Sequence, residues 1–196
     1  TAPAPETVVP KLKDRVDPSE IGAALPALNP AAYDLALAGS PYRWGDYEVG
    51  ERIDHVDGMT LEEAEHQMAT RLYQNTAKVH FNQYAQRQTP RGKRLIYGGV
   101  AISLARSMAF NGLANAQYML AINAGRHVNP LFAGDTLYAW SEVLAKEDLG
   151  EAGALRLRLV AVKNKPTAGF PFKNEAGEYD PGVVLDFDYW AAIPKR

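Results

Sequence analysis

Cysteine is the first thing that this sequence lacks, since none occurs among its 196 residues. Disulfide bonds and thiolate metal sites are therefore excluded, which fits a reducing compartment, and we predict a cytoplasmic protein. No apolar run approaches the ~20 residues that a membrane-spanning helix needs. The net charge of -2 gives no electrostatic reason to expect nucleic acid or an anionic membrane as a partner.

Recognisable cofactor motifs are missing as well. No spacing among the four histidines and the nearby carboxylates matches a metal site, and no phosphate-binding glycine-rich motif or nucleophile elbow occurs. We therefore expect no metal and no redox cofactor. What the sequence does have is a hydrophobic share of 46% and a charged share of 22%, which are typical of one globular domain with a real core.

Prolines are concentrated at the start of the chain, where they disfavour a long helix and favour extended segments. Residues 29–38 fit a short helix with Asn29 as its N-cap and Gly39 as its end. The first residues include neither Met nor a signal segment, and they read as the interior of a longer polypeptide. We predict a Pro/Ala-rich linker and arm over residues 1–43, lying on the surface of a domain formed by residues 44–196.

A short strand and a capped helix are predicted at the start of the domain. Residues 52–57 alternate apolar and polar side chains up to Gly58. Thr60-Leu-Glu-Glu63 forms a capping box, with Thr60 as N-cap. The helix that it opens carries an apolar stripe of Leu61, Ala64, Met68 and Leu72 at helical spacing. We expect this stripe to face the core and the helix to end near residue 73.

A second, apolar helix follows after a segment without a clear period. Residues 74–82 are predicted to be a loop. Residues 97–110 are apolar on nearly every side, which is typical of a buried helix. Asn111-Gly112 supplies its end.

The second half of the chain has the period of two that half-buried antiparallel strands show. In the clearest case Leu155, Leu157 and Leu159 fall on one face, and Arg156 and Arg158 on the other. The predicted strands cover residues 118–128, 136–144, 154–163 and 183–193. On the last of them the apolar face consists of Val183, Leu185, Phe187 and Tyr189. Residues 165–179 read as a surface excursion. One apolar helix before a run of strands predicts an α+β fold with an antiparallel sheet wrapped around that helix.

His80, in the predicted loop, is the candidate acid–base residue. Imidazole is the usual side chain for moving protons near neutral pH. The amide of Asn75, five positions earlier, can hold a water molecule without competing for the proton. A lone histidine in a loop is more often structural or solvated than catalytic, so the surroundings decide between the two interpretations.

Gly98 and Gly99 open the apolar helix directly after Tyr97. Because they lack a β-carbon, a ligand can approach their backbone N–H groups, and the helix dipole adds partial positive charge. This geometry is needed to hold the oxygen of a thioester or an enolate. The alternative is that the two glycines only permit tight packing.

The other histidines give weaker signals. His55, on the first strand, and His66, in the capped helix, are interpreted as structural or exposed. Arg126 and His127 lie on a predicted strand and could contact an anionic ligand, although a solvated strand edge fits equally well.

Three segments resemble the MaoC-like R-specific enoyl-CoA hydratases. Asn75-Thr-Ala-Lys-Val-His80 keeps the spacing of that family's Asp-x-Asn-Pro-x-His loop. Ile96-Tyr-Gly-Gly99 falls where the family has a segment similar to Ile-Ala-His-Gly. Pro130-Leu-Phe-Ala-Gly-Asp-Thr-Leu137 resembles the family's Pro-x-x-x-Gly-Asp-Thr-Leu. The resemblance implies the hotdog fold.

A closer similarity covers nearly the whole chain. It is to the C-terminal half of the mesaconyl-CoA hydratases, a family also called β-methylmalyl-CoA dehydratases, which joins two hotdog domains by a linker. The segments that carry it are Ala4–Pro10, Asp46–Gly58, Phe110–Asn115 and Asp135–Glu142. The resemblance implies a second hotdog domain as partner, either another copy or an N-terminal half. A single hotdog also leaves a long sheet edge, and such edges are normally paired.

One departure from the MaoC-like pattern affects the expected mechanism. The family's Asp is replaced by Asn75, and its Asn-Pro pair by Ala77-Lys78. An amide cannot take a proton as a carboxylate does. Only His80 therefore carries over directly, while Asn75 carries over by position, as an amide that orients water.

The resemblance implies a hydro-lyase that reversibly adds water to a branched dicarboxylic enoyl-CoA, converting mesaconyl-CoA to β-methylmalyl-CoA. Coenzyme A would enter as part of the acyl-CoA substrate. The catalytic residues would be His80 and Asn75, with Tyr97, Gly98 and Gly99 at the thioester and Arg126, Arg71 or Arg94 at the free carboxylate. One alternative is a non-catalytic acyl-CoA-binding half that depends on a missing N-terminal domain. A thioesterase is the third hypothesis.

Overall fold

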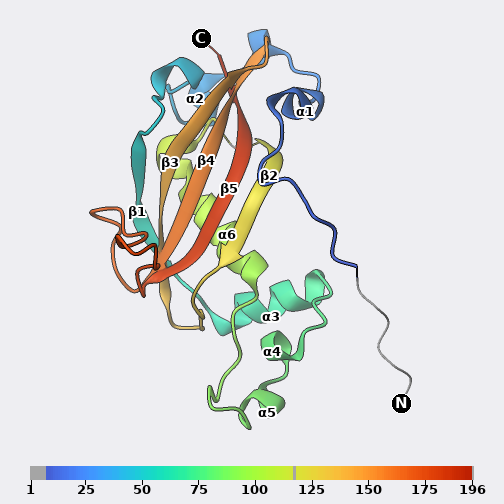
Figure 1. Cartoon of the computed structure of the whole chain (residues 1–196), viewed down its shortest axis with the longest axis vertical. Helices are drawn as coiled ribbons and strands as arrows, with labels where there is room; N and C mark the ends of the chain where they lie inside the picture. Colours follow the sequence, from blue (N-terminus) through green and yellow to red (C-terminus); the bar gives the residue numbers. More distant parts are fainter. Residues whose placement is uncertain (1–7, 117, 196) are drawn as a thin grey trace.

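A single antiparallel sheet with one helix across it dominates the computed structural model of the chain (Figure 1). The structure describes residues 8–116 and 118–195; the part of the predicted linker at residues 1–7 lies outside them. The five strands pair in the order β1-β3-β4-β5-β2, and each neighbouring pair is antiparallel. They are β1 (Arg52–Thr60), β2 (Tyr118–His127), β3 (Thr136–Asp148), β4 (Ala152–Lys163) and β5 (Val183–Pro194). The predicted α+β hotdog architecture is thus confirmed.

The inner face of the sheet forms the main core against helix α6 (Gly98–Met108). Leu155, Leu157 and Leu159 are fully buried on this face, as their alternation predicted. The prediction for Val183 was wrong, because this side chain packs on the outer face with Trp140, and Val184 takes the inner position. A register shift between β4 and β5 at this point explains the change of face.

Helix α6 is buried on the side that faces the sheet. Val100, Ala101, Ala105 and Met108 form that side, whereas Ser103 and Ser107 are exposed, so the helix is not covered all round. The chain turns after α6 in the short helix α7 (Phe110–Leu113), where Gly112 has a φ of 97°. The predicted end at Asn111-Gly112 is therefore confirmed, and glycine meets the need for a left-handed conformation there.

Helix α3 (Glu63–Leu72) differs from its prediction in two ways. Thr60 is not its N-cap, because β1 continues to Thr60, which pairs with Thr136, and the reciprocal cap is formed by Glu62 and Glu65 instead. Of the predicted apolar stripe, Leu61 is buried in the main core just before the helix, but Ala64 is exposed, Met68 is 62% and Leu72 is 70% exposed. The buried residues of α3 are His66 and Thr70. The apolar period alone predicted the wrong buried face for α3. Hydrogen bonds of polar side chains determine that face instead.

The segment predicted as a loop, residues 74–82, contains one single-turn helix, and a second follows directly after it. They are α4 (Lys78–Phe81) and α5 (Gln83–Gln86), so His80 lies on a helical turn. Together with α3 they lie beyond one end of the sheet, beside the first turn of α6 (Figure 1). This is the end at which the candidate site forms.

Part of the N-terminal arm, around Val16 and α1, lies against the outer face of the sheet. Ile21, on α1 (Pro18–Ala23), is fully buried in a cluster with Ala154 and Trp190. Val16 anchors the arm nearby through its N–H, which donates to Oδ1 of Asn123 at 2.7 Å. The boundary at residues 43 and 44 stays a prediction.

The short helix predicted at residues 29–38 is divided in two. The pieces are η1 (Pro30–Ala32) and α2 (Leu35–Ala38). Asn29 makes no side-chain cap; Asp34 caps α2, and Gly39 ends it as predicted. A further 3-10 turn, η2 (Trp44–Asp46), precedes β1. No helix in residues 8–116 and 118–195 is long and apolar enough to cross a membrane.

Candidate active site

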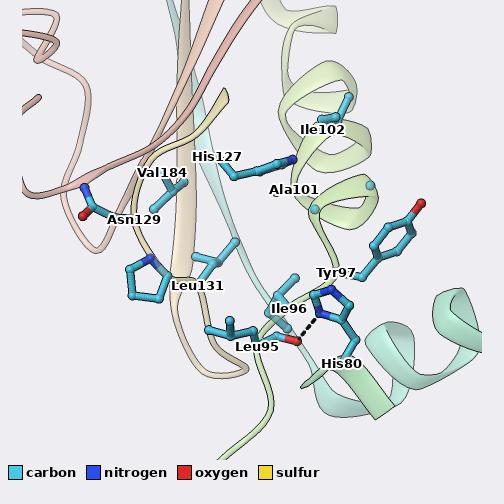
Figure 2. Close-up of a pocket in the computed structure, with 13 residues that line it drawn as sticks. His80, Leu95, Ile96, Tyr97, Ala101, Ile102, His127, Asn129, Leu131 and Val184 are labelled. Atoms are coloured by element: carbon cyan, nitrogen blue, oxygen red, sulfur yellow. Dashed lines mark hydrogen bonds between the residues drawn. The ribbon is translucent and has the colours of Figure 1, made fainter. Parts of the chain in front are cut away.

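A cavity of about 520 Å³ opens at the first turn of α6. Its lining combines α4, the residues leading into α6, the end of β2 with the segment after it, and one residue of β5. Figure 2 shows His80 and Tyr97 on one side of the cavity, with His127 reaching toward α6 from β2. The lining residues are His80, Leu95, Ile96, Tyr97, Gly98, Gly99, Ala101, Ile102, His127, Asn129, Pro130, Leu131 and Val184.

The orientation of His80 leaves one ring nitrogen available. Nδ1 lies 3.1 Å from the backbone oxygen of Leu95, which can only accept, so in the neutral ring Nδ1 carries the proton (Figure 2). Nε2 then has a free lone pair and no hydrogen-bond partner among the described residues. The ring lies 5.8 Å from that of Tyr97, centroid to centroid. A half-buried imidazole held in this tautomer is suited to accept a proton from a ligand or a water molecule.

The local sequence explains why His80 is held in this position. Oδ1 of Asn75 accepts the N–H of Ala77 at 3.0 Å, an Asx turn that leads into α4. On α3, the side-chain amide of Gln67 donates to the backbone oxygen of His80 at 3.3 Å. His80 is thereby anchored from both sides through backbone groups, which leaves its Nε2 free.

The first turn of α6 brings backbone N–H groups to the cavity. The initial N–H groups of a helix have no partner within the helix and carry partial positive charge. A β-carbon on Gly98 would lie 2.4 Å from Nε2 of His127, and one on Gly99 would lie 2.7 Å from the Tyr97 ring. Close packing thus accounts for both glycines, and the oxyanion-binding interpretation of their N–H groups stays a prediction compatible with it.

His66 contacts the same turn, although its position in the sequence suggested a structural or exposed residue. Its side chain is buried, with 1% exposure, and its Nε2 accepts the N–H of Tyr97 at 2.9 Å. Burial, followed by the charge of Arg94, lowers the pKa of His66, while Glu63 opposes the shift. The ring stands 6.3 Å from that of His80. His66 lies off the apolar stripe of this helix, so no pattern in the sequence drew attention to it.

His127 is the second imidazole in the cavity. Partial burial and the charge of His80 lower the pKa of His127. Nearby, the side-chain amide of Asn129 donates to the backbone oxygen of Val183 at 2.7 Å, which holds the end of β2 against β5. The described lining contains no Arg, Lys, Asp or Glu, so the two imidazoles are its candidate acid–base groups.

The structure brings together four of the predicted site residues and leaves two elsewhere. His80, Tyr97, Gly98 and Gly99 share the cavity. Asn75 lies over a separate hollow formed with Gln67, Thr70 and Arg71. Arg126 borders a hollow on the outer face of the sheet with Arg158 and Tyr179. No group of three or more His, Asp or Glu residues that could hold a metal ion occurs in the part of the chain described.

Two other charged or titratable residues have clear structural partners. Arg94 pairs with Glu63 and also donates to the backbone oxygen of Phe81 at 3.4 Å. His55 is fully buried; its Nδ1 lies 2.6 Å from the backbone oxygen of Asn111 and its Nε2 2.8 Å from Oγ of Ser141. With both ring nitrogens occupied, His55 is structural, one of the two interpretations left open by the sequence.

Comparison with known proteins gives two close relatives and several structural neighbours, while no family model matches the chain. The chain is 59% identical over its full length to β-methylmalyl-CoA dehydratase of Chloroflexus aurantiacus and 58% identical over 99% of its length to mesaconyl-CoA hydratase of Cereibacter sphaeroides. It spans 56% of the length of each relative.

The solved structures agree with this similarity. A MaoC domain protein from Chloroflexus aurantiacus superposes over the whole chain with a TM-score of 0.90 and 58% identity, and the match covers 56% of that protein. A Mycobacterium tuberculosis protein with a double hotdog fold matches 79% of the chain and 44% of its own length, with a TM-score of 0.56 and 19% identity. The second likeness supports the fold alone.

Proposed function

We infer that the chain belongs to the MaoC-like hotdog proteins, from its similarity to them, and we propose that it reversibly hydrates mesaconyl-CoA to β-methylmalyl-CoA. The observation that carries the proposal is the free Nε2 of His80 in a cavity that also exposes the first turn of α6. A base and an oxyanion-binding group are the two elements that addition of water to an enoyl thioester requires. The reaction is redox-neutral, and coenzyme A enters as part of the substrate, so we propose no separate cofactor.

In the proposed hydration step, His80 acts first as base. A water oxygen bonds to the β-carbon of the enoyl group while one of its O–H bonds breaks and the proton passes to Nε2 of His80. The electron pair of the double bond moves toward the thioester as an enolate. N–H of Gly99, with that of Gly98, binds the enolate oxygen, an interaction that can contribute ~3–4 kcal/mol.

The same imidazole completes the addition. The imidazolium of His80 returns the proton to the α-carbon as the enolate collapses, so that H and OH have been added across the double bond. We assign both transfers to His80 because the described lining contains no carboxylate and Asn75 carries an amide. In dehydration the steps run backwards, with His80 as acid toward the leaving hydroxyl. The Asx turn of Asn75 supports α4, so we propose that it orients His80 rather than water.

We assign the free carboxylate of the acyl group to His127 instead of Arg126. Successive residues of a strand point to opposite faces, and β2 pairs Arg126 with Asp186 and His127 with Leu185. Leu185 belongs to the inner core, whereas Arg126 borders the outer hollow. His127 is thus the neighbour that lines the cavity. A carboxylate bound beside His127 favours the charged form of the imidazole. This offsets the lowering of the His127 pKa by burial.

A second hotdog domain is the proposed partner, through the free edge of β2. Within the described residues β2 pairs only with β5; Tyr118 on it is 53% and Ile122 57% exposed. Unpaired edges favour association, and the chain spans little more than half of its relatives' length. Light scattering is expected to detect an oligomer of the chain or a complex with the other half. A stable monomer that ignores added partner would contradict this.

The function is tested by incubating the purified chain with mesaconyl-CoA and, separately, with crotonyl-CoA. We expect hydration of mesaconyl-CoA at a higher kcat/KM than crotonyl-CoA. Tight binding of a CoA thioester in calorimetry without turnover would favour a non-catalytic binding half that needs another domain. This alternative is compatible with a chain that spans 56% of the length of its relatives. Release of free thiol would identify a thioesterase.

A further inference from the structure

We propose that His66 is a positioning residue for the first turn of α6 and that it does so only while its imidazole is neutral. The inference rests on the proposed function, since it names what orients the N–H groups of Gly98 and Gly99. It begins from the contact between Nε2 of His66 and the N–H of Tyr97, which is 2.9 Å long.

Tyr97 is the N-cap of α6, and its two backbone groups are held from opposite directions. Its oxygen accepts the N–H of Val100 at 2.9 Å, which closes the first turn of the helix. Its N–H points out of the helix and finds His66. The preceding N–H, of Ile96, donates to the oxygen of Leu131 at 2.8 Å. His66 therefore supplies the last fixed point before the glycines, and a shift of Tyr97 would move both of their N–H groups.

The sequence of α6 provides no other acceptor for the N–H of its N-cap. In a capping box a Glu or Gln at the third helical position accepts that N–H. Here the third position is Val100, whose side chain has no polar atom, and α6 has no side-chain cap. His66 on α3 takes over this role from outside the helix. Because it is 1% exposed, water cannot readily replace it if it is removed.

The contact depends on the protonation state of His66. Nε2 accepts only while it has a lone pair; in the imidazolium both nitrogens donate, and an N–H would face the N–H of Tyr97. The groups around the ring are Glu63 on its own helix, Arg94 before α6 and His80 on α4. Burial, Arg94 and His80 lower the pKa of His66, and Glu63 opposes them. His66 is thus neutral near neutral pH and takes up a proton as the pH falls.

A neutral His66 also assists the proposed base. Its ring centroid lies 6.3 Å from that of His80, which becomes an imidazolium during turnover. A second positive charge at that distance would disfavour proton transfer to His80. Acid conditions should consequently impair the site through protonation of His66.

Two substitutions of His66 separate its role as hydrogen-bond acceptor for Tyr97 from the charge that it gains on protonation. Gln in His66→Gln offers an oxygen near the position of Nε2 and does not titrate, whereas His66→Leu removes the acceptor. We expect His66→Leu to lower kcat about 10-fold with KM for mesaconyl-CoA changed less than about two-fold, because the oxyanion-binding N–H groups are displaced rather than lost. His66→Gln should restore most of kcat. The fall of its rate toward acid pH should be less steep than that of the unmodified chain, because it lacks the protonation of His66.

Met68→Ala is the matched control, since Met68 lies on the same helix and is 62% exposed; its kcat and pH profile should equal those of the unmodified chain. The proposal is overturned if His66→Leu keeps kcat within about two-fold, or if His66→Gln is as impaired as His66→Leu with an unchanged acid limb. If His66→Leu does not fold, the pH profile of His66→Gln alone decides.

NMR of the imidazole nitrogens gives a readout that does not need turnover. It should find His66 of the full chain with Nε2 unprotonated, and the amide signals of Tyr97 and Gly98 should shift in His66→Leu more than in His66→Gln. A proton on Nε2 of His66 at neutral pH would refute the positioning role. Absence of hydratase activity together with an unprotonated Nε2 would instead reject the proposed function and leave the contact intact.

Discussion

The two ends of α6 are both tied to the rest of the fold by histidines, but the bonds differ in kind. Beyond its C-terminal end, His55 of β1 is fully buried with a partner on each ring nitrogen, at 2.6 and 2.8 Å. At its N-terminal end, His80 is half-buried and uses only Nδ1, at 3.1 Å. Nε2 of His80 faces a cavity of about 520 Å³. One end of the helix is closed and the other is open to a ligand.

The difference shows how a single residue type serves two purposes on one element. When a buried ring with both nitrogens hydrogen-bonded is altered, the protein loses stability. Such a ring also has no free lone pair with which to accept a proton. A ring with one free nitrogen beside a cavity contributes little to stability and can exchange a proton. The number of occupied ring nitrogens, rather than burial alone, separates the two roles.

His80→Ala is expected to have the largest effect on activity. Loss of the acid–base group should cut hydration of mesaconyl-CoA by ~100-fold or more. The free energy of unfolding should change by only about 1 kcal/mol, because one hydrogen bond of a half-buried side chain is lost. Steady-state kinetics and denaturant titration of the same preparation measure both quantities. Near-normal turnover would remove His80 from the mechanism.

His55→Ala is expected to show the opposite pattern. The substitution removes two hydrogen bonds and leaves the buried hydroxyl of Ser141 and the oxygen of Asn111 without their partner. We expect a loss of about 2–4 kcal/mol in the free energy of unfolding. The kcat of the folded fraction should stay within a few-fold of normal. If stability were unchanged while kcat fell as in His80→Ala, the distinction between the two ends would fail.

His127→Leu should affect one substrate and not the other. With this imidazole removed, His80 is the one imidazole left in the described lining, and the proposed mechanism uses it as the base. The KM for mesaconyl-CoA should therefore rise about 10-fold, equivalent to ~1.4 kcal/mol. Crotonyl-CoA lacks this carboxylate, and its kinetics should change less than about three-fold. Arg126→Leu is the matched control on the outer face. Equal losses on both substrates would assign His127 a general role in shaping the cavity.

Asn75→Asp should have the smallest effect. A carboxylate can accept the N–H of Ala77 as the amide does, so α4 should form normally and kcat should stay within about three-fold. Asn75→Ala removes the acceptor and should cost about 1 kcal/mol of stability. A marked loss of kcat in Asn75→Asp with unchanged stability would restore the interpretation in which the amide NH₂ orients water.

Much of this fold follows from the sequence, because its strands have a clear period. The side chains from Leu155 to Leu159 alternate as the sheet requires, and the apolar residues of α6 with Gly112 mark a helix and its end. Val183 was misassigned because a register shift between β4 and β5 changes the face at that point. Such an irregularity leaves no trace in the period of the strand itself.

The candidate site is predicted only in part. His80 and the Gly98-Gly99 pair could be identified because residue type and spacing suit the chemistry. His66 could not, since an apolar stripe competes with it for the buried face of α3 and a hydrogen bond across the fold decides the outcome. Arg126 and its neighbour His127 lie on opposite faces of the sheet, and the strand period did not indicate which of the two faces the cavity.

The most direct test of the central claim is to follow mesaconyl-CoA with the purified chain in water enriched in the heavy oxygen isotope. Mass spectrometry of the thioester should detect β-methylmalyl-CoA that carries one heavy oxygen, at its hydroxyl group, with the CoA still attached. The same incubation with His80→Ala should give almost none. A heavy oxygen found in a free carboxylic acid together with released CoA, or equal labelling by His80→Ala, would contradict the account.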